Sequence, residues 1–330
     1  MRSVVHYYRV SSIKYRVSIF RKQGLETSNQ RRVKEKKLSQ QDKVVVTCAL
    51  TGLLTDPAKF NVPVTPEEMA DAAEQSYNAG ASLLHCHFRD QRDGMGAFPT
   101  WDLESVGNIL TAIKQRVPDI IICMSTGVLG EDISGPVGCL EAFKPEMAAC
   151  NAGSLNYLKI RKDGNWAWPP ALFDNPVEKV NRFLDVMTAN NITPEFECFD
   201  TGIVRSVSMY KANGMFEGAP HVSFVMGVDS GMPANPELLP ILKGELSVNS
   251  HWQVIATGPG RDKIWNLHRR CLELGGDVRT GLEDTFYLPD GEQANTNGQL
   301  IEALVKIARE VGREPASTAE AREILGIMRS

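Results

Sequence analysis

The chain has 330 residues, of which 42% are hydrophobic and 23% are charged, a composition typical of a folded globular protein. The formal net charge of -4 and a pI near 5.9 disfavour a general nucleic-acid binder, which needs a basic face. No apolar run approaches the roughly 18 residues that a membrane-spanning helix requires, so we expect no membrane partner.

The first 42 residues differ in charge from the rest of the chain. The segment MRSVVHYYRVSSIKYRVSIFRKQG is rich in arginine and lysine and contains no acidic residue, and a second basic cluster, RRVKEKKLSQQ, follows. Such a composition is typical of an organelle presequence or a disordered basic tail, and it also arises when a start codon is assigned too early. We expect residues 1–42 to be an extension outside the fold and residues 43–330 to form a single catalytic domain.

From residue 43 onward, short β-rich runs alternate with stretches of helical spacing. The first predicted helix has Thr65 as its N-cap, Pro66 at its first position, Glu68 three residues after the cap and Gly80 as its stop signal. Eight strands alternating with helices predict a (β/α)8 TIM barrel of the α/β class. A doubly wound sheet is the alternative, but no GxGxxG motif follows the first strand. The predicted strands cover residues 44–50, 82–88, 119–126, 146–153, 193–200, 221–228, 251–258 and 276–284.

The chain contains seven cysteines, an odd number, and no CxxC pair. Most of them fall in short apolar runs, where cysteine serves as a small hydrophobic residue. This pattern indicates a reducing compartment, and we expect the protein to be cytoplasmic.

Two histidines, His85 and His87, stand one residue apart at the polar end of the second predicted strand, in LLHCHFRD. Residues i and i+2 of a strand point to the same side, so the two imidazoles should lie next to each other. Two imidazoles and one carboxylate with open positions for substrate are the pattern of a catalytic zinc site, and Glu283 at the end of the last strand is the candidate third ligand. The alternative is a pair of hydrogen-bonded histidines at the barrel mouth.

Other charged residues stand inside otherwise apolar strands, where burial is costly unless the charges are paired or bind a metal. Arg279 and Asp284 are one such pair, in which the guanidinium should lower the pKa of the carboxyl group and hold it ionised as a general base. A structural ion pair that closes the barrel is an equally good interpretation. Glu197 on the fifth strand is a candidate for orienting substrate or neighbouring groups.

Three turns after strands carry candidate binding groups. Ser125, Thr126, Asn151 and Ser154 lie in two adjacent glycine-containing turns that suit a carboxylate or an oxyanion, although such residues are also common in turns for local reasons. The segment GPGRD, with Gly258 and Gly260, precedes a predicted helix, and its backbone amides could hold a phosphate. In barrels a phosphate site often follows the seventh and eighth strands.

Six segments follow one another along the chain: VVVTCALTG, AGASLLHCHFRD, MSTG, NAGSLNY, PEFECFDTG and LGGDVRTGLED. In these segments and their order, the chain resembles the β-keto acid cleavage enzymes, whose founding member is the 3-keto-5-aminohexanoate cleavage enzyme. This resemblance implies a zinc-dependent barrel, usually a homotetramer. It implies that a β-keto acid condenses with acetyl-CoA and is then cleaved, in a retro-Claisen step, to acetoacetate and a new acyl-CoA.

Carried over to this chain, the resemblance implies particular residue roles. The metal ligands fall on His85, His87 and Glu283, and the base falls on Asp284, modulated by Arg279. The acid of the fifth strand falls on Glu197, with Glu195 two residues earlier as the alternative, and the substrate carboxylate falls near Ser125 and the fourth-strand turn.

Two other functions remain open from the sequence. One is a metal-dependent C–C lyase or aldolase that needs no acetyl-CoA, and the other is a non-catalytic barrel that binds a metabolite. After the first strand, Leu53 and Leu54 stand where an enzyme for an amino-substituted keto acid would carry an acidic residue. The sequence leaves the identity of the keto acid open.

Overall fold

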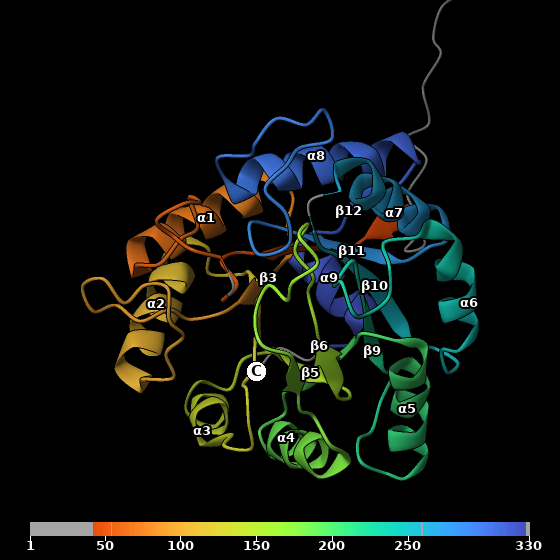
Figure 1. Ribbon diagram of the computed structural model, residues 1–330, viewed down its shortest axis with the longest axis horizontal. Coiled ribbons are helices and arrows are strands. Elements are labelled where there is room, and N and C mark those ends of the chain that lie inside the picture. The colour runs from red at the N-terminus through yellow and green to blue at the C-terminus, as the bar shows by residue number, and fades with distance from the viewer. Residues whose placement is uncertain (1–41, 54, 259, 328–330) are drawn as a thin grey trace, which may run out of the picture. The chain divides into compact units, whose positions relative to one another are not determined.

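Eight parallel strands form a closed barrel in the computed structural model, which describes residues 42–53, 55–258 and 260–327 (Figure 1). Strands that follow one another in the chain lie side by side, and the last pairs with the first, so the predicted TIM barrel is confirmed. The barrel strands are β2 (Val46–Ala49), β3 (Leu83–Cys86), β4 (Ile121–Met124), β5 (Met147–Asn151), β8 (Thr193–Cys198), β9 (His221–Met226), β10 (His251–Ala256) and β11 (Asp277–Thr280).

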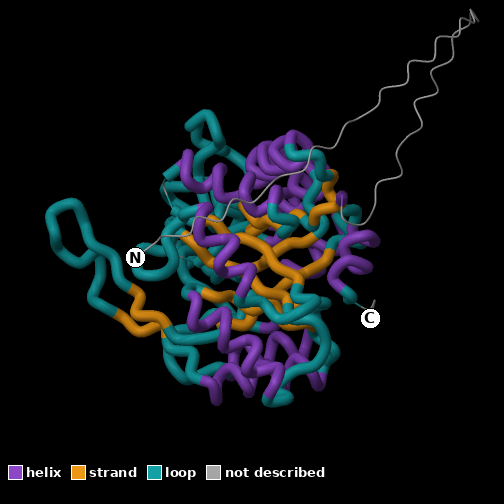
Figure 2. Tube along the Cα trace, turned by 90° about the vertical axis from the view of Figure 1, so that its right-hand side faces the viewer, coloured by secondary structure: helices purple, strands orange, loops and turns teal. Residues whose placement is uncertain are grey.

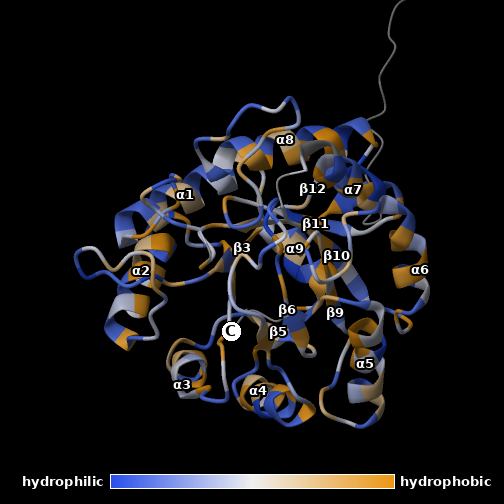
Figure 3. Cartoon of the chain, in the orientation of Figure 1, coloured by the Kyte–Doolittle hydropathy of each residue, from blue (hydrophilic) through white to orange (hydrophobic). Residues whose placement is uncertain are grey.

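Helices follow the barrel strands and surround them. Most of them carry both hydrophobic and hydrophilic residues (Figure 3), as expected for helices with one face against a sheet. On α2, for example, Val106, Ile109 and Ile113 are completely buried at a spacing of three and four residues. The helices are α1 (Pro66–Ala79), α2 (Leu103–Arg116), α3 (Ser134–Phe143), α4 (Val177–Ala189), α5 (Thr201–Ala212), α6 (Leu239–Gly244, after a 3-10 turn at Pro236–Leu238), α7 (Arg261–Glu273) and α8 (Asn297–Glu310).

The predicted start and stop of α1 are confirmed. The Thr65 side chain accepts a hydrogen bond from the backbone N–H of Glu68, whose carboxylate accepts one from the backbone of Thr65. Pro66 occupies the first turn, and Gly80 ends the helix in the left-handed conformation with φ of 113°.

Several elements were not predicted from the sequence. The helix α9 (Thr318–Leu325) contributes Ala321 and Leu325 to a cluster with barrel residues such as Ile121 and Met147, so it closes the amino-terminal end of the barrel. The two-residue strands β1 (Lys43–Val44) and β12 (Glu314–Pro315) pair beside it. The strands β6 (Leu155–Tyr157) and β7 (Ala171–Phe173) form an antiparallel hairpin that projects from the loop side of the barrel (Figure 2).

The predicted extension, residues 1–42, lies outside the described residues apart from Asp42, and so does Leu54. Within the part of the chain that the structure describes, no helix is long and apolar enough to cross a membrane. All seven cysteines are buried free thiols.

Candidate active site

His85, His87 and Glu283 meet at the carboxyl-terminal end of the barrel. The Nε2 atoms of His85 and His87 lie 3.7 Å and 3.4 Å from Glu283 Oε1, and the two imidazole centres are 5.2 Å apart. Strand β2, which separates β3 from β11, sets this arrangement: Ala49 pairs with His85, and its carbonyl oxygen accepts a hydrogen bond from the N–H of Glu283. The three side chains predicted as metal ligands are therefore neighbours.

Two glycines allow Glu283 to approach β2 closely. A Cβ atom at Gly281 would lie 2.0 Å from the carbonyl oxygen of Ala49. At Gly52, which has φ of 58°, a Cβ atom would lie 2.7 Å from Cγ of Glu283. Neither position tolerates a side chain without displacing the strand end that carries Glu283.

These three residues fit a divalent metal ion. Both ring nitrogens of His85 and Oε2 of Glu283 are buried without a hydrogen-bond partner among the described residues. Such atoms are costly to leave unpaired, and two nitrogens and one oxygen are a donor set that zinc accepts. His85, His87 and Glu283 are also one of two described groups whose ligand atoms all lie within 4.8 Å of one another.

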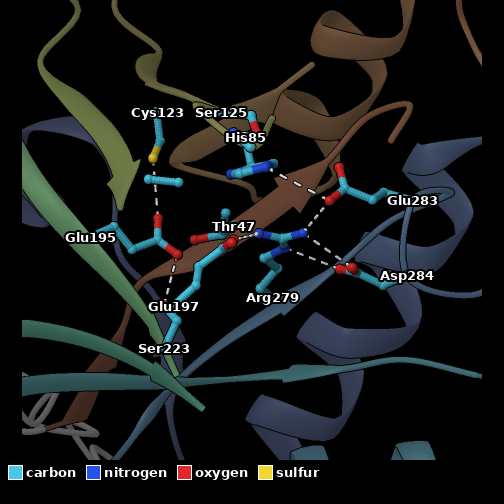
Figure 4. Close-up of polar contacts among 12 residues, drawn as sticks. Thr47, His85, Cys123, Ser125, Glu195, Glu197, Ser223, Arg279, Glu283 and Asp284 are labelled. Carbon is cyan, nitrogen blue, oxygen red and sulfur yellow. Dashed lines mark hydrogen bonds and ion pairs between the residues drawn. The ribbon is translucent and has the colours of Figure 1, made fainter. Parts of the chain in front are cut away.

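Arg279 is the centre of a buried ion network beside these residues (Figure 4). Its guanidinium donates to Asp284 through two hydrogen bonds of 3.1 Å, to Glu197 Oε1 at 3.1 Å and to Glu283 Oε1 at 2.6 Å. One cation thus faces three carboxyl groups. If all three are ionised, the cluster has a net negative charge, which a divalent cation would offset.

Burial and this crowding set the pKa values of the carboxyl groups. For Glu283, burial favours the protonated form, but the charge of Arg279 outweighs it and holds the pKa well below its usual range. Burial raises the pKa of Glu197 to about 8, although Arg279 opposes the shift. Burial also lowers the pKa of His85 well below its usual value, so the imidazole is neutral, as a metal ligand must be.

Arg279 lowers the pKa of Asp284 as expected, but the expectation that it holds the pKa below its usual range is wrong. Burial of Asp284, together with the negative charge of Glu283, outweighs the guanidinium and raises the pKa to about 7. Arg279 cannot compensate fully because it is shared with two further carboxyl groups. The bidentate pairing itself, which orients Asp284, is present as expected.

Ser125 and Asn151 face the same point at the barrel mouth. A Cβ atom at Gly127 would lie 3.7 Å from both Ser125 Oγ and Asn151 Nδ2, so the two polar groups flank this bare backbone position. Asn151 on β5 is also the register partner of Glu197 on β8. Through this register pair, the two donors lie near the ion network.

The other two turn residues are engaged locally. The hydroxyl of Thr126 donates to the carbonyl oxygen of Ala149 at 2.6 Å. Ser154 is exposed, and its Oγ accepts a hydrogen bond from the backbone N–H of Asn175 at 2.8 Å. Both hydroxyls thus tie their turns to neighbouring segments, Thr126 to β5 and Ser154 to Asn175, and their contact with a substrate stays a prediction.

The glycines after β10 lie next to the same end of the barrel. The N–H of Gly258, which has φ of 103°, donates to the carbonyl oxygen of Asp284 at 3.3 Å. Gly260 is the N-cap residue of α7. The first N–H groups of a helix lack partners within the helix, so this position suits an anion, and phosphate binding there stays a prediction.

The sequence placed Arg89 and Glu195 at the strand ends but did not predict their buried partners. Arg89 of the HxHxRD motif is buried. It donates hydrogen bonds to Thr51 and to the carbonyl oxygens of Thr55 and Gly96, and so fixes the loops around the site. Glu195 lies in the barrel interior and belongs, with Cys123 and His85, to the second group of candidate ligands. The i, i+2 spacing of Glu195 and Glu197 indicated that both point to the same side of the strand. It did not indicate the partners of Glu195, which lie on other strands far away in the chain.

A family model for the beta-keto acid cleavage enzymes matches residues 43–327, almost the whole described chain. The chain belongs to the β-keto acid cleavage enzyme family. It is 34% identical to a 3-keto-5-aminohexanoate cleavage enzyme of Acetoanaerobium sticklandii, over 87% of this chain and 99% of the relative. It is 32% identical to a 3-oxoadipate:acetyl-CoA acetyltransferase of Cupriavidus necator, over 86% of this chain and 94% of the relative.

Solved structures agree with the barrel fold of this β-keto acid cleavage enzyme. The apo structure of ObcA superposes with a TM-score of 0.63 at 19% sequence identity over 81% of this chain. The chain spans 65% of the length of ObcA, and at this level of identity the likeness concerns the fold alone.

Proposed function

We propose that this enzyme is a transferase that converts a β-keto acid and acetyl-CoA to acetoacetate and a new acyl-CoA. The observation that carries the proposal is the junction of two groups: His85, His87 and Glu283 on one side, and Asp284 held by Arg279 on the other. The names of the relatives, keto acid cleavage enzyme and acetyl-CoA acetyltransferase, support the same reaction class.

A divalent metal, with zinc as our choice, would be held by His85, His87 and Glu283. When bound there, the metal would polarise the ketone of the substrate and spread the negative charge that develops on deprotonation. Two imidazoles and one carboxylate leave positions open for the ketone and carboxylate oxygens of a β-keto acid.

Asp284 is the proposed general base. It accepts the proton from the carbon between the ketone and the carboxylate, while the two hydrogen bonds from Arg279 keep its carboxyl group in place. The resulting carbon nucleophile attacks the thioester carbonyl of acetyl-CoA and releases the CoA thiolate. The thiolate then attacks the original ketone carbon, and cleavage of the adjacent C–C bond yields the new thioester and the carbanion of acetoacetate. The carbanion takes back the proton that Asp284 accepted in the first step.

Glu197 is proposed to carry a proton in this sequence. With a pKa of about 8, it is protonated at neutral pH and can donate to an oxygen that gains negative charge. Its carboxyl group is linked through Arg279 to Asp284, so a change of charge on one affects the other.

Substrate binding is proposed at the strand ends. Ser125 and Asn151 are the leading candidates for the substrate carboxylate because they flank the open position at Gly127. Thr126 and Ser154 would contribute to substrate binding indirectly, by holding in place the turns that carry them. Gly260 would bind a phosphate of acetyl-CoA at the start of α7, and Gly258 would hold the preceding turn in place through its hydrogen bond to Asp284.

Further properties belong to the same proposal. Family resemblance supports a homotetramer, and the seven free thiols support a cytoplasmic enzyme.

We propose that residues 1–42 lie outside a single catalytic domain, so a chain that begins at residue 43 should retain activity. A hydrophobic Leu53 supports a keto acid without an amino group, in contrast to the substrate named for the Acetoanaerobium relative.

The test is incubation of the zinc-loaded protein with a panel of β-keto acids, with and without acetyl-CoA. Acetoacetate that forms only when acetyl-CoA is present would support the proposed transfer and would rank the keto acids. Product from a keto acid alone would instead identify a lyase. Ligand binding without product, at any metal content, would leave only a metabolite-binding barrel.

A further inference from the structure

Glu195 is a buried carboxylate that the proposed reaction does not use. Only 2% of the residue is exposed, and three donors from three other strands hold it. Ser223 Oγ and Gln253 Nε2 donate to Oε1 at 2.7 Å and 2.9 Å, and the thiol of Cys123 donates to Oε2 at 3.1 Å. Its position is therefore fixed, and Oε2 retains capacity for a second donor.

His85 needs an acceptor and has a ring nitrogen within 4.8 Å of a carboxylate oxygen of Glu195. Both its ring nitrogens are buried without a partner among the described residues. His85 shares one group of candidate ligands with Cys123 and Glu195, and another with His87 and Glu283, each with ligand atoms within 4.8 Å. Figure 4 shows the imidazole of His85 between Glu195 and Cys123 on one side and Glu283 on the other.

A neutral imidazole has one N–H donor and one lone pair, and it can satisfy both only with a different partner on each side. In proteins, a metal-binding histidine commonly donates its second N–H to a carboxylate, which fixes the tautomer and the ring orientation. The Glu283 side of His85 carries the proposed metal position, and the Glu195 side offers the carboxylate.

We propose that Glu195 is a positioning residue for His85: its Oε2 accepts the Nδ1–H of His85 and directs the Nε2 lone pair to the metal. This inference rests on the proposed metal site. Glu195 is a better acceptor than Cys123, because a carboxylate oxygen forms stronger hydrogen bonds than sulfur and because the thiol proton already points to Oε2.

A second metal ion bound by His85, Cys123 and Glu195 is the competing explanation of the same group. It would require the imidazole of His85 to lose both protons or to leave the first metal. It would also require a thiolate at Cys123, whose pKa burial raises well above the usual range. The two explanations differ in stoichiometry: one metal per chain or two.

The experiment compares zinc affinity and stoichiometry in the full-length wild-type, Glu195→Gln, Gln253→Leu and Cys123→Ala proteins, with a chromophoric chelator as competitor. We expect one zinc per wild-type chain, an affinity about 10- to 100-fold weaker in Glu195→Gln, and an affinity within about threefold of wild type in the other two. The visible absorption bands of the cobalt(II)-loaded protein should shift in Glu195→Gln alone. Gln253→Leu is the matched control because Gln253 donates to Oε1 of Glu195 and not to Oε2, the oxygen proposed to accept from His85.

Equal losses in Glu195→Gln and Gln253→Leu would overturn the inference and assign Glu195 a packing role. Two zinc ions per wild-type chain, with one lost in Cys123→Ala, would overturn it in favour of the second metal. If Glu195→Gln does not fold, Glu195→Asp, which keeps the charge but shortens the reach, should show the same loss of affinity. A wild-type protein that binds no zinc would refute the proposed metal site itself, whereas zinc-dependent turnover with unchanged affinity in Glu195→Gln would refute only the role of Glu195.

Discussion

Arg279 binds Asp284 in a bidentate manner: Nε donates to Oδ2 and Nη2 to Oδ1, each at 3.1 Å. The two planar groups are therefore held in one orientation, which a single hydrogen bond would not fix. The same guanidinium also reaches Glu197 and Glu283. One side chain thus links the proposed base, the proposed proton donor and the proposed metal ligand.

Replacement of Arg279 by lysine should disrupt this link although the charge is retained. An ammonium group cannot form the paired hydrogen bonds, so we expect a loss of roughly 1–3 kcal/mol in the free energy of unfolding and a fall in turnover. Urea unfolding and acetoacetate formation measure the two effects. The control is Arg269→Lys in the exposed pair with Glu310, where the change in stability should stay below about 1 kcal/mol. Equal effects in both variants would contradict the central role of Arg279.

Replacement of Asp284 by asparagine should remove the base while zinc binding persists. We expect turnover to fall by about 10²- to 10⁴-fold, the usual contribution of general base catalysis. In the wild type, kcat/KM should decrease as the pH falls, because protonation inactivates the base, and the pKa of about 7 in the metal-free protein becomes lower beside a bound cation. Asp277→Asn, at the other end of the same strand, is the control. More than a tenth of wild-type turnover in Asp284→Asn would exclude the assignment.

Removal of one imidazole should abolish metal binding. We expect His85→Ala to bind less than about a tenth of an equivalent of zinc per chain, because one of the three protein ligands is deleted. The variant should therefore form no acetoacetate. Zinc at 100 times its Kd should also stabilise the folded wild type by about 2.7 kcal/mol and so raise its melting temperature. The melting temperature of His85→Ala should stay unchanged. His251→Ala, in a histidine that stacks on His221 at the opposite end of the barrel, should retain both properties. Full turnover in metal-free wild-type protein would be incompatible with the proposed site.

Replacement of Ser125 by alanine should weaken binding of the β-keto acid. Loss of one hydrogen bond to a charged carboxylate corresponds to about 1.5–3 kcal/mol, or roughly a 10- to 150-fold rise in KM, with a smaller change in kcat. Ser206→Ala, in a serine of α5 whose hydroxyl donates to the backbone of Gly202, is the control. Steady-state kinetics with the best keto acid of the panel distinguish the two, and an unchanged KM in Ser125→Ala would place the substrate carboxylate elsewhere.

Sequence patterns predicted the barrel and the meeting of His85 with Glu283, because strand alternation and strand ends are local properties. They did not predict α9, a short helix that follows the eight repeating units and packs into the barrel interior. The partners of Glu195 were also missed, since Cys123, Ser223 and Gln253 stand 72, 28 and 58 residues away in the chain.

The pKa of Asp284 shows a different limit of sequence reasoning. The spacing of Arg279 and Asp284 indicated an ion pair, which the structure contains. It did not indicate that Glu197 and Glu283 share the guanidinium or that all these groups are buried, and these two facts reverse the direction of the shift.

Asp277 at the amino-terminal end of β11 should give the protein a measurable pH dependence of stability. Its Oδ1 accepts a hydrogen bond from the N–H of Val45 at 2.8 Å, and Arg313 lies 4.0 Å away. Burial nevertheless raises the pKa to about 6. The folded state therefore binds the proton more tightly than the unfolded state, and stability decreases as the pH rises from about 4 to above 6.

Asp277→Asn isolates this effect. Buried histidines such as His221, whose pKa burial lowers to about 3, change stability in the opposite direction as the pH rises, so the wild-type profile alone mixes both contributions. Subtraction of the variant's profile removes the histidines, because the asparagine oxygen can still accept from Val45. We expect the stability of the wild type relative to the variant to fall by about 3 kcal/mol between pH 4 and pH 7 and then to level off. Urea unfolding at a series of pH values measures the difference, and a constant difference would mean that Asp277 is ionised as readily in the folded protein as in the unfolded chain.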